Sequence, residues 1–181
     1  GLFVAVGWDG TVLTSSDGVS WTVRSSGTDA RLYGVTHGDG LFVAVGSGVT
    51  VLTSSDGVSW TVRSSGTDAW LSGVTHANGL FVAVGQRGSI LTSSDGVAWT
   101  ARSSGTDAWL YGVTRGDGLF VAVGLGGTIL TSPDGVSWTV RDSGTRATLR
   151  GVTHGDGLFV AVGWDGTVLT SSDGVSWTVR S

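Results

Sequence analysis

The sequence predicts an all-β protein, and three observations lead to this class. The 181 residues include 32 glycines and one proline but neither glutamate nor lysine, so every acid is Asp and every base is Arg. Exposed faces of long helices normally carry Glu and Lys, which makes such helices poor candidates here. Short runs of Val and Leu alternate with Thr, Ser and Ala, and Gly-rich or Asp-Gly segments separate them. This pattern is typical of short strands joined by tight turns.

A 39-residue repeat organises the whole chain. The hexapeptide Leu-Phe-Val-Ala-Val-Gly begins at Leu2, Leu41, Leu80, Leu119 and Leu158. We therefore expect a single repeat domain with four full units and one partial unit, namely residues 1–39, 40–78, 79–117, 118–156 and 157–181. Residues 1–25 and 157–181 are identical, which indicates recent amplification or engineering of one unit.

Each unit is expected to form four antiparallel strands, a to d, which in the third copy are 70–76, 80–85, 89–93 and 98–102. Asn-Gly and Asp-Gly segments between them supply the positive φ values of two-residue hairpin turns. Strand b is apolar on both sides, so every sheet needs a neighbouring sheet on each face. Radial stacking of four-stranded blades in a β-propeller provides this. A β-trefoil has three such units and a β-solenoid usually has shorter coils, so both fit less well.

Closure of the ring is a special feature of this chain, which contains five b-c-d sets but four a strands. The predicted propeller has five blade positions, and its first blade lacks the innermost strand. Strand b at residues 2–6 would then be an open edge beside the channel. We expect either a gapped ring or pairing of this unpaired strand edge with another chain or an exchanged repeat in a homo-oligomer.

The segment Ser15-Ser16-Asp17-Gly18-Val19-Ser20-Trp21 recurs in all five copies, with Pro133 and Ala98 as its two replacements at Ser16 and Ser20. It resembles the Asp-box of bacterial neuraminidase (BNR) repeats, Ser-x-Asp-x-Gly-x-x-Trp, although Gly18 follows Asp17 directly and the motif is one residue shorter. The resemblance implies a sialidase-like Asp-box β-propeller, with an extracellular or cell-envelope location. Such propellers include glycosidases, lectin-like modules, receptors and assembly factors. We expect each Asp to cap its turn and each Trp to pack between sheets.

Several function classes are disfavoured by composition. A net charge of -4 without a basic run gives no electrostatic footprint for nucleic acid. The apolar runs are too short for membrane insertion, and the absence of Cys removes thiolate metal sites. His37, His76 and His154 share one repeat position, with Arg115 in the fourth copy. Equivalent positions on successive blades usually stand apart, so we expect hydrogen-bonded or solvated turn residues there rather than metal ligands.

The sequence contains no catalytic motif. Sialidases need an arginine cluster and a tyrosine nucleophile activated by Glu, and this chain has no Glu. A glycosidase with two Asp residues needs unlike environments for the pair, whereas nearly every Asp here is one of several repeat equivalents. We therefore predict no enzyme activity, no catalytic residues and no cofactor, and an Asp-box glycosidase is the third-ranked reading.

The positions that vary between copies indicate a binding surface. They lie in the b-c turn and at the start of strand a, which share one end of the blades because successive strands alternate in direction. Drift after duplication should not favour exposed Trp, yet four Trp residues lie outside the recurring motif. The candidate ligand-binding residues are Trp8, Asp9, Arg31, Tyr33, Trp70, Arg87, Trp109, Tyr111, Arg150, Trp164 and Asp165.

These observations predict a non-catalytic recognition module whose partner is a glycan or a protein surface. The leading interpretation is lectin-like carbohydrate binding through shallow sites at the end of the blades that carries the b-c turns and the connections from strand d to strand a, the b-c/d-a face. A Trp beside polar side chains suits the apolar face and hydroxyl rim of a sugar. The alternative is a structural or protein-assembly propeller scaffold, engineered or natural, with no small ligand.

Overall fold

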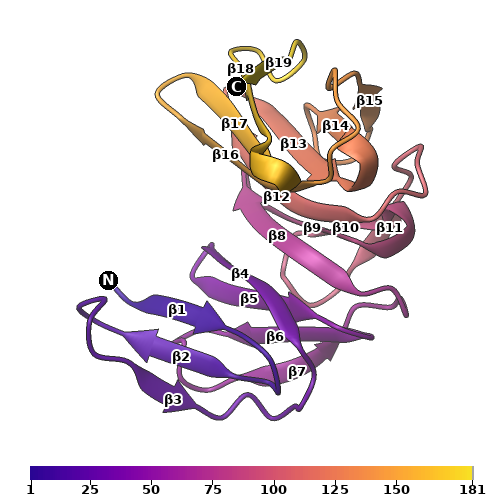
Figure 1. The fold of residues 1–181 in the computed structure, drawn as a ribbon. Coiled ribbons are helices and arrows are strands. Elements are labelled where there is room, and N and C mark those ends of the chain that lie inside the picture. The colour runs from indigo at the N-terminus through magenta and orange to yellow at the C-terminus, as the bar shows by residue number, and fades with distance from the viewer. Residues whose placement is uncertain (181) are drawn as a thin grey trace.

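The computed structural model describes residues 1–180, which form five antiparallel β-sheets arranged as the blades of a propeller (Figure 1). The first sheet contains β1 (Phe3–Val6), β2 (Val12–Ser15) and β3 (Thr22–Arg24). The second contains β4 (Leu32–Gly38), β5 (Leu41–Gly46), β6 (Thr50–Ser54) and β7 (Thr61–Ser64). The third contains β8 (Leu71–Ala77), β9 (Leu80–Gly85), β10 (Ile90–Ser93) and β11 (Thr100–Arg102).

The fourth sheet contains β12 (Leu110–Gly116), β13 (Leu119–Gly124), β14 (Ile129–Ser132) and β15 (Thr139–Arg141). The fifth contains β16 (Leu149–Gly155), β17 (Leu158–Gly163), β18 (Val168–Ser171) and β19 (Thr178–Arg180). Short 3-10 turns, η1 (Gln86–Gly88), η2 (Leu125–Gly127) and η3 (Trp164–Gly166), join strands b and c in the last three sheets. The prediction of an all-β propeller with five blade positions is confirmed.

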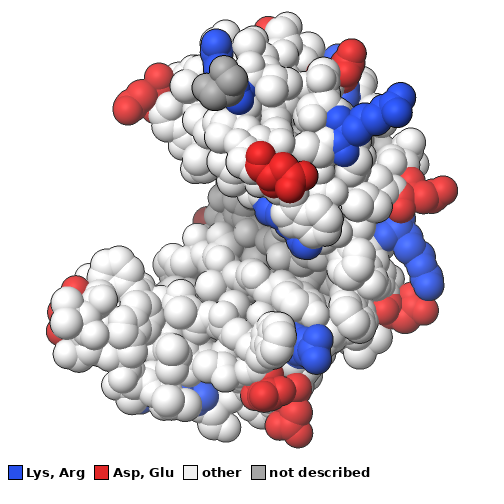
Figure 2. Space-filling view, viewed as in Figure 1, with Lys and Arg blue, Asp and Glu red and all other residues white. Residues whose placement is uncertain are grey.

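The blades form an open arc. The strands β4, β8, β12 and β16 contact one another in sequence order, so they line the inner side of the arc. The first sheet has the order β1-β2-β3 and lacks this inner strand, as the strand count of the sequence predicted. The first and last sheets lie at opposite ends of the chain of blades (Figure 1), and a deep hollow separates the two lobes in the space-filling view (Figure 2).

Turn chemistry agrees with the prediction at the a-b turns and differs at the c-d turns. Asp39 and Gly40 have φ values of 49° and 74°, and Asn78 and Gly79 have 52° and 71°, as two-residue hairpin turns require. In the c-d segment, by contrast, residues 16–21 separate β2 from β3, and Gly18 alone among them has a positive φ. The prediction that Asp-Gly makes a two-residue turn there was wrong, because the Asp side chain organises a longer loop.

That loop is built by the motif residues. The Asp17 Oδ1 atom accepts hydrogen bonds from the backbone N–H groups of Val19 and Ser20, both at 2.8 Å, and from the Ser15 hydroxyl at 2.9 Å. The Trp21 indole N–H donates to the carbonyl of Gly18 at 3.3 Å. The N–H donors of Ser20 and Val19, followed by the Ser15 hydroxyl, lower the pKa of Asp17 from 3.8 to about 2. The capping role expected for the Asp is confirmed.

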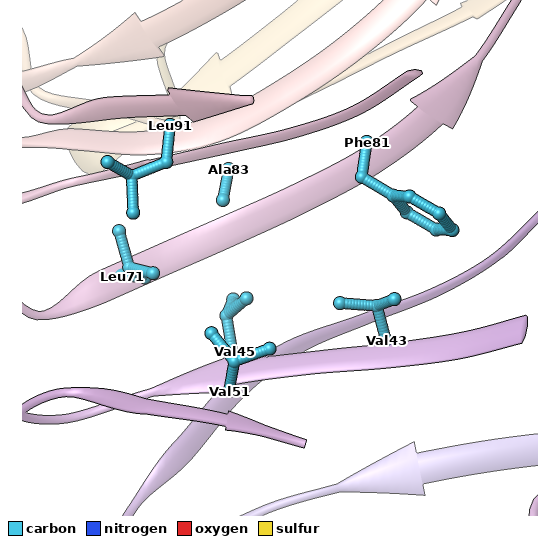
Figure 3. Close-up of a cluster of buried hydrophobic side chains, with 7 residues drawn as sticks. All are labelled: Val43, Val45, Val51, Leu71, Phe81, Ala83 and Leu91. Carbon is cyan, nitrogen blue, oxygen red and sulfur yellow. The ribbon is translucent and has the colours of Figure 1, made fainter. Parts of the chain in front are cut away.

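The core lies between blades and is repeated. In the interface shown in Figure 3, Val43, Val45 and Val51 of the second sheet face side chains of the third sheet. These side chains are Leu71, Phe81, Ala83 and Leu91. Equivalent clusters join the third sheet to the fourth and the fourth to the fifth. Strand b is apolar on both sides because one side packs on the preceding blade and the other on the following blade.

The lowered pKa values predict loss of stability in acid. The pKa of Asp17, Asp56 and Asp173 is about 2 in the folded chain, below the ordinary value of an unfolded Asp, so their hydrogen bonds stabilise the fold above about pH 4 and are lost as pH falls toward 2. We expect the urea midpoint to fall between about pH 5 and pH 2, measured by tryptophan fluorescence. The urea midpoint of the Asp95→Asn variant should fall less steeply with pH than that of the parent chain. A parent midpoint that stays constant over this range would contradict the prediction.

The missing inner strand predicts a local difference in hydrogen exchange. The Gly7 amide donates to Thr11 in the turn to β2, and amides alternate along a strand, so those of Val4 and Val6 face the side where the inner strand is absent. We expect them to exchange much faster than those of Val43 and Val45, which face β4. Equal protection of the two pairs in a monomeric sample, measured by NMR, would show that the β1 edge is covered.

Candidate functional site

Aromatic and arginine side chains form a row of two segments across all five blades, at the end formed by the b-c turns and the starts of the inner strands. We call this row the aromatic arc. Within each segment every member contacts the next, either ring to ring or guanidinium to ring. Two segments make it up, Trp8-Arg31 and Tyr33-Trp70-Trp109-Tyr111-Arg150-Trp164. Eight of the eleven predicted site residues therefore lie in one surface.

The middle of the arc is a stack of four rings. Tyr33 of the second blade lies 6.3 Å from Trp70 of the third at an interplanar angle of 27°. Trp70 meets Trp109 of the fourth blade edge to face at 6.2 Å, and Trp109 stacks on Tyr111 at 5.4 Å and 24°. Such offset and edge-on contacts suit the quadrupoles of the rings. The rings thus form a connected apolar surface rather than four separate platforms.

Arginines extend this surface on both sides. The Arg150 guanidinium lies 4.1 Å from the centroid of Tyr111 and 4.8 Å from that of Trp164, and Arg31 lies 4.8 Å from Trp8. A guanidinium over an aromatic face keeps its N–H groups free at its edge to donate hydrogen bonds. The arc therefore combines apolar ring surface with cationic donors held in place by stacking.

The position of the arc depends on a β-bulge that sequence reasoning missed. In each complete blade the register between strands a and b shifts by one residue at the start of strand a. The residue at the shift is Tyr33, Ser72, Tyr111 or Arg150 in successive blades. An extra residue in one strand bends that strand and re-aims its side chains. The sequence signal for this position is its variability between copies, without any sign of the bulge itself.

A pocket of about 390 Å³ lies within the arc, lined by Tyr33, Ser72, Trp109, Tyr111 and Arg150. These residues come from four blades, so the pocket is at the inner side of the propeller. The indole N–H of Trp109 donates to the Ser72 hydroxyl at 2.8 Å and fixes the ring across the blade boundary. Ser72 is the member that sequence reasoning left out of the site, because a serine in one copy carries no chemical signal of its own.

Three predicted residues lie apart from these contacts. Arg87 lines a separate groove of about 510 Å³ that also includes Trp99 and Arg102. Asp9 and Asp165 occupy b-c turns with φ values of 53° and 55°, where Asp tolerates the left-handed conformation better than most residues. The turn geometry explains these two carboxylates without a ligand.

The histidines stand separately and support the blades. Each packs at a tilt against the Phe of its own strand pair, with centroid distances of 4.3 to 4.4 Å. His76 Nε2 lies 3.0 Å from the Asp39 carboxylate of the preceding blade, and His154 Nε2 lies 2.9 Å from Asp117. Within residues 1–180 no group of three His or Asp side chains could hold a metal ion. No helix in this region is both long enough and apolar enough to span a membrane.

No protein-family model matches the chain, and no curated protein does either. Solved structures do. YCF48 bound to D1 peptide is similar with a TM-score of 0.73 and 20% identity, over 98% of this chain and 63% of its own. YCF48 from Cyanidioschyzon merolae gives 0.69 and 17%, over 97% of this chain and 66% of its own. The computationally designed Ika4 protein gives 0.64 and 13%, over 78% and 91%.

These likenesses support the propeller fold. The chain spans less than two thirds of the length of either YCF48 structure.

The two kinds of tryptophan should respond differently to truncation. Trp99 is partly buried and packs against the core cluster between the second and third blades, so Trp99→Ala should cost roughly 3 kcal/mol, the low end of the range for core aromatics. Trp70, 37% exposed, should cost about 1 kcal/mol or less. Urea unfolding measures both. Trp21→Ala is the matched control, because it has the same motif but no preceding blade; a Trp70→Ala loss equal to that of Trp99→Ala would assign the arc to the core.

Proposed function

We propose that this chain is a non-catalytic binding module of the protein-assembly kind, which holds a polypeptide segment of a partner protein on the aromatic arc. The observation that carries the proposal is the pocket lined by Tyr33, Ser72, Trp109, Tyr111 and Arg150. It crosses four blades, so an extended segment lying over the inner strands would contact all of them. Concave sites with apolar lining and a few polar groups are the usual form of binding pockets.

The chemistry of the lining defines the segment. The parts of Trp109 and Tyr111 that line the pocket suit apolar side chains, and the Ser72 and Tyr111 hydroxyls can bond to peptide groups. Arg150 is held by stacking on Tyr111, with its guanidinium 4.1 Å from the ring centroid. Its free N–H groups favour a carboxylate, to which they can donate two parallel hydrogen bonds. We infer a segment that carries apolar side chains beside a carboxylate.

A polypeptide fits this surface better than a sugar. Sugar binding by Trp depends on open ring faces, whereas Arg31 covers a face of Trp8 and Arg150 covers faces of Tyr111 and Trp164. Trp109 is likewise stacked against Tyr111. The similar structure of YCF48 bound to D1 peptide adds support from the same fold. Carbohydrate binding, the leading reading of the sequence, becomes an outcome of the test.

Two predictions from the sequence, the lack of catalysis and the Asp-box resemblance, are part of this proposal. The chain acts without catalysis, which the absence of Glu and the repeated environment of its Asp residues support. Its c-d turns are related to Asp-box turns, which the Asp cap and the Trp21 to Gly18 hydrogen bond support. In this view the c-d turns hold the blades together while the opposite end binds.

A displayed library of linear peptides, screened in parallel with a glycan array, tests the proposed function. We expect enrichment of peptides with apolar residues beside Asp, Glu or a free C-terminus, and little glycan binding. Arg150→Ala and Tyr111→Ala should each weaken the selected peptide at least about tenfold, as for arginine and tyrosine hot spots.

Arg87→Gly is the control, because Arg87 belongs to the same end of the propeller but lines the other groove, and glycine suits its φ of 54°. Its peptide affinity should equal that of the parent chain. Glycan binding that Arg150→Ala abolishes would restore the carbohydrate reading, and peptide binding unaffected by either arc variant would overturn the proposal.

A further inference from the structure

The first and fifth sheets, at the two ends of the series of blades, each expose one half of the blade-to-blade interface that recurs inside the molecule. We call the side of a blade that presents its Leu and Val residues the valine face, and the side that presents Phe, Ala, Leu and Trp the phenylalanine face. On the fifth sheet the valine face consists of Leu158, Val160, Val162 and Val168. On the first sheet the phenylalanine face consists of Phe3, Ala5, Leu13 and Trp21.

Exposure marks both faces as unpartnered. Val162 is 46% exposed, whereas its equivalents Val45, Val84 and Val123 are 0% exposed. Phe3 is 54% exposed, whereas Phe81 and Phe120 are 1% exposed. No charged residue belongs to either face, and the walls of the hollow between the lobes are largely free of charged side chains (Figure 2). Apolar surface of this kind is rarely left in water without a partner.

The two faces match residue by residue in strands b, c and d. Between the fourth and fifth sheets, Leu119, Val121, Val123 and Ile129 form one side of the interface. The other side consists of Phe159, Ala161, Leu169 and Trp177, together with Leu149 and Val152 of the inner strand β16. The exposed valine face repeats the first set with Val168 in place of Ile129, and the exposed phenylalanine face repeats the second set, since residues 1–25 and 157–181 are identical. A first sheet placed on a fifth sheet would therefore repeat the contacts of strands b, c and d, without those of an inner strand.

We propose that the first sheet of a second copy of this chain docks on the fifth sheet, valine face to phenylalanine face, so that copies associate head to tail. The first sheet has no inner strand, so its phenylalanine face has no equivalents of Leu149 and Val152, and the docked interface would lack these two side chains. A contact between two different surfaces extends from copy to copy and closes into a ring or continues as a filament.

A second copy is favoured over other occupants. The chain's own first sheet lies across the hollow from its fifth (Figure 1), so it does not cover it. An unrelated protein would have to reproduce the spacing of Phe, Ala, Leu and Trp that this chain already carries. The proposed contact uses neither the open β1 edge nor the aromatic arc, so it is independent of the proposed function.

Sedimentation velocity over a concentration series, with two face variants, tests the proposal. We expect reversible self-association of the parent chain. Phe3→Asp and Val162→Asp should each weaken it at least about tenfold, because an unpaired carboxylate would be buried against apolar surface. Both residues are exposed in the single chain, so urea midpoints should stay near that of the parent. Val49→Asp, also exposed at 53% but on a turn of the second blade, is the matched control and should associate normally.

A mixture of the two variants tests the head-to-tail geometry directly. Phe3→Asp keeps an intact valine face and Val162→Asp keeps an intact phenylalanine face, so the mixture should form a one-to-one dimer that neither variant forms alone. A parent chain that stays monomeric at its highest soluble concentration would overturn the proposal. Association that survives both substitutions, or that one of them leaves intact, would overturn it as well.

Discussion

Packing of one blade on the next is the interaction on which the rest of this structure depends. A four-stranded sheet of 39 residues cannot bury both of its apolar sides by itself, so its stability comes from its neighbours. The side chains Val43 and Val45 meet Phe81 and Ala83 in one interface, and the same residue types meet in the following two. The inner strands, the bulge at their start and the surface above them are all placed by this stacking.

The two ends of each blade differ in how much they vary between copies. At the c-d end, every copy uses the same Asp to cap its loop, and the histidine pairs link neighbouring blades. The Trp of the motif packs on a core cluster in four copies, whereas Trp21 of the first copy is 43% exposed because no blade precedes it. At the other end the copies differ, and Tyr33, Ser72, Tyr111 and Arg150 bring four different chemistries to one repeat position. Stability thus depends on the residues that repeat, whereas the residues that vary are those for which we propose a binding role.

Much of this was predictable from the sequence. Strand b of the third copy was predicted at 80–85 and is β9, and the count of strands foretold the incomplete first blade. Periodicity and turn residues suffice for such features because they act locally. The b-c/d-a face was likewise predicted as variable and aromatic.

The details of the site were not predictable, because they depend on contacts between blades. The stacking of Arg150 on Tyr111 joins residues from neighbouring blades, and the bulge is a register shift that leaves no composition signal. The predicted role of Asp9 and Asp165 rested on their place beside Trp, whereas their φ values supply a conformational reason for them. The longer c-d loop shows the same limit, since the Asp17 side chain replaces the backbone bonds of a tight hairpin.

Near-identity of the interior interfaces also bears on how such a chain can change its length. Unequal recombination between copies would add or remove one unit at a time, and each new junction would be of a kind that the molecule already contains. The gene could therefore sample different numbers of blades without first inventing a contact, while the variable positions would diversify independently in each copy. The same uniformity carries a hazard during folding, because a strand from one copy can pair within another at little energetic difference.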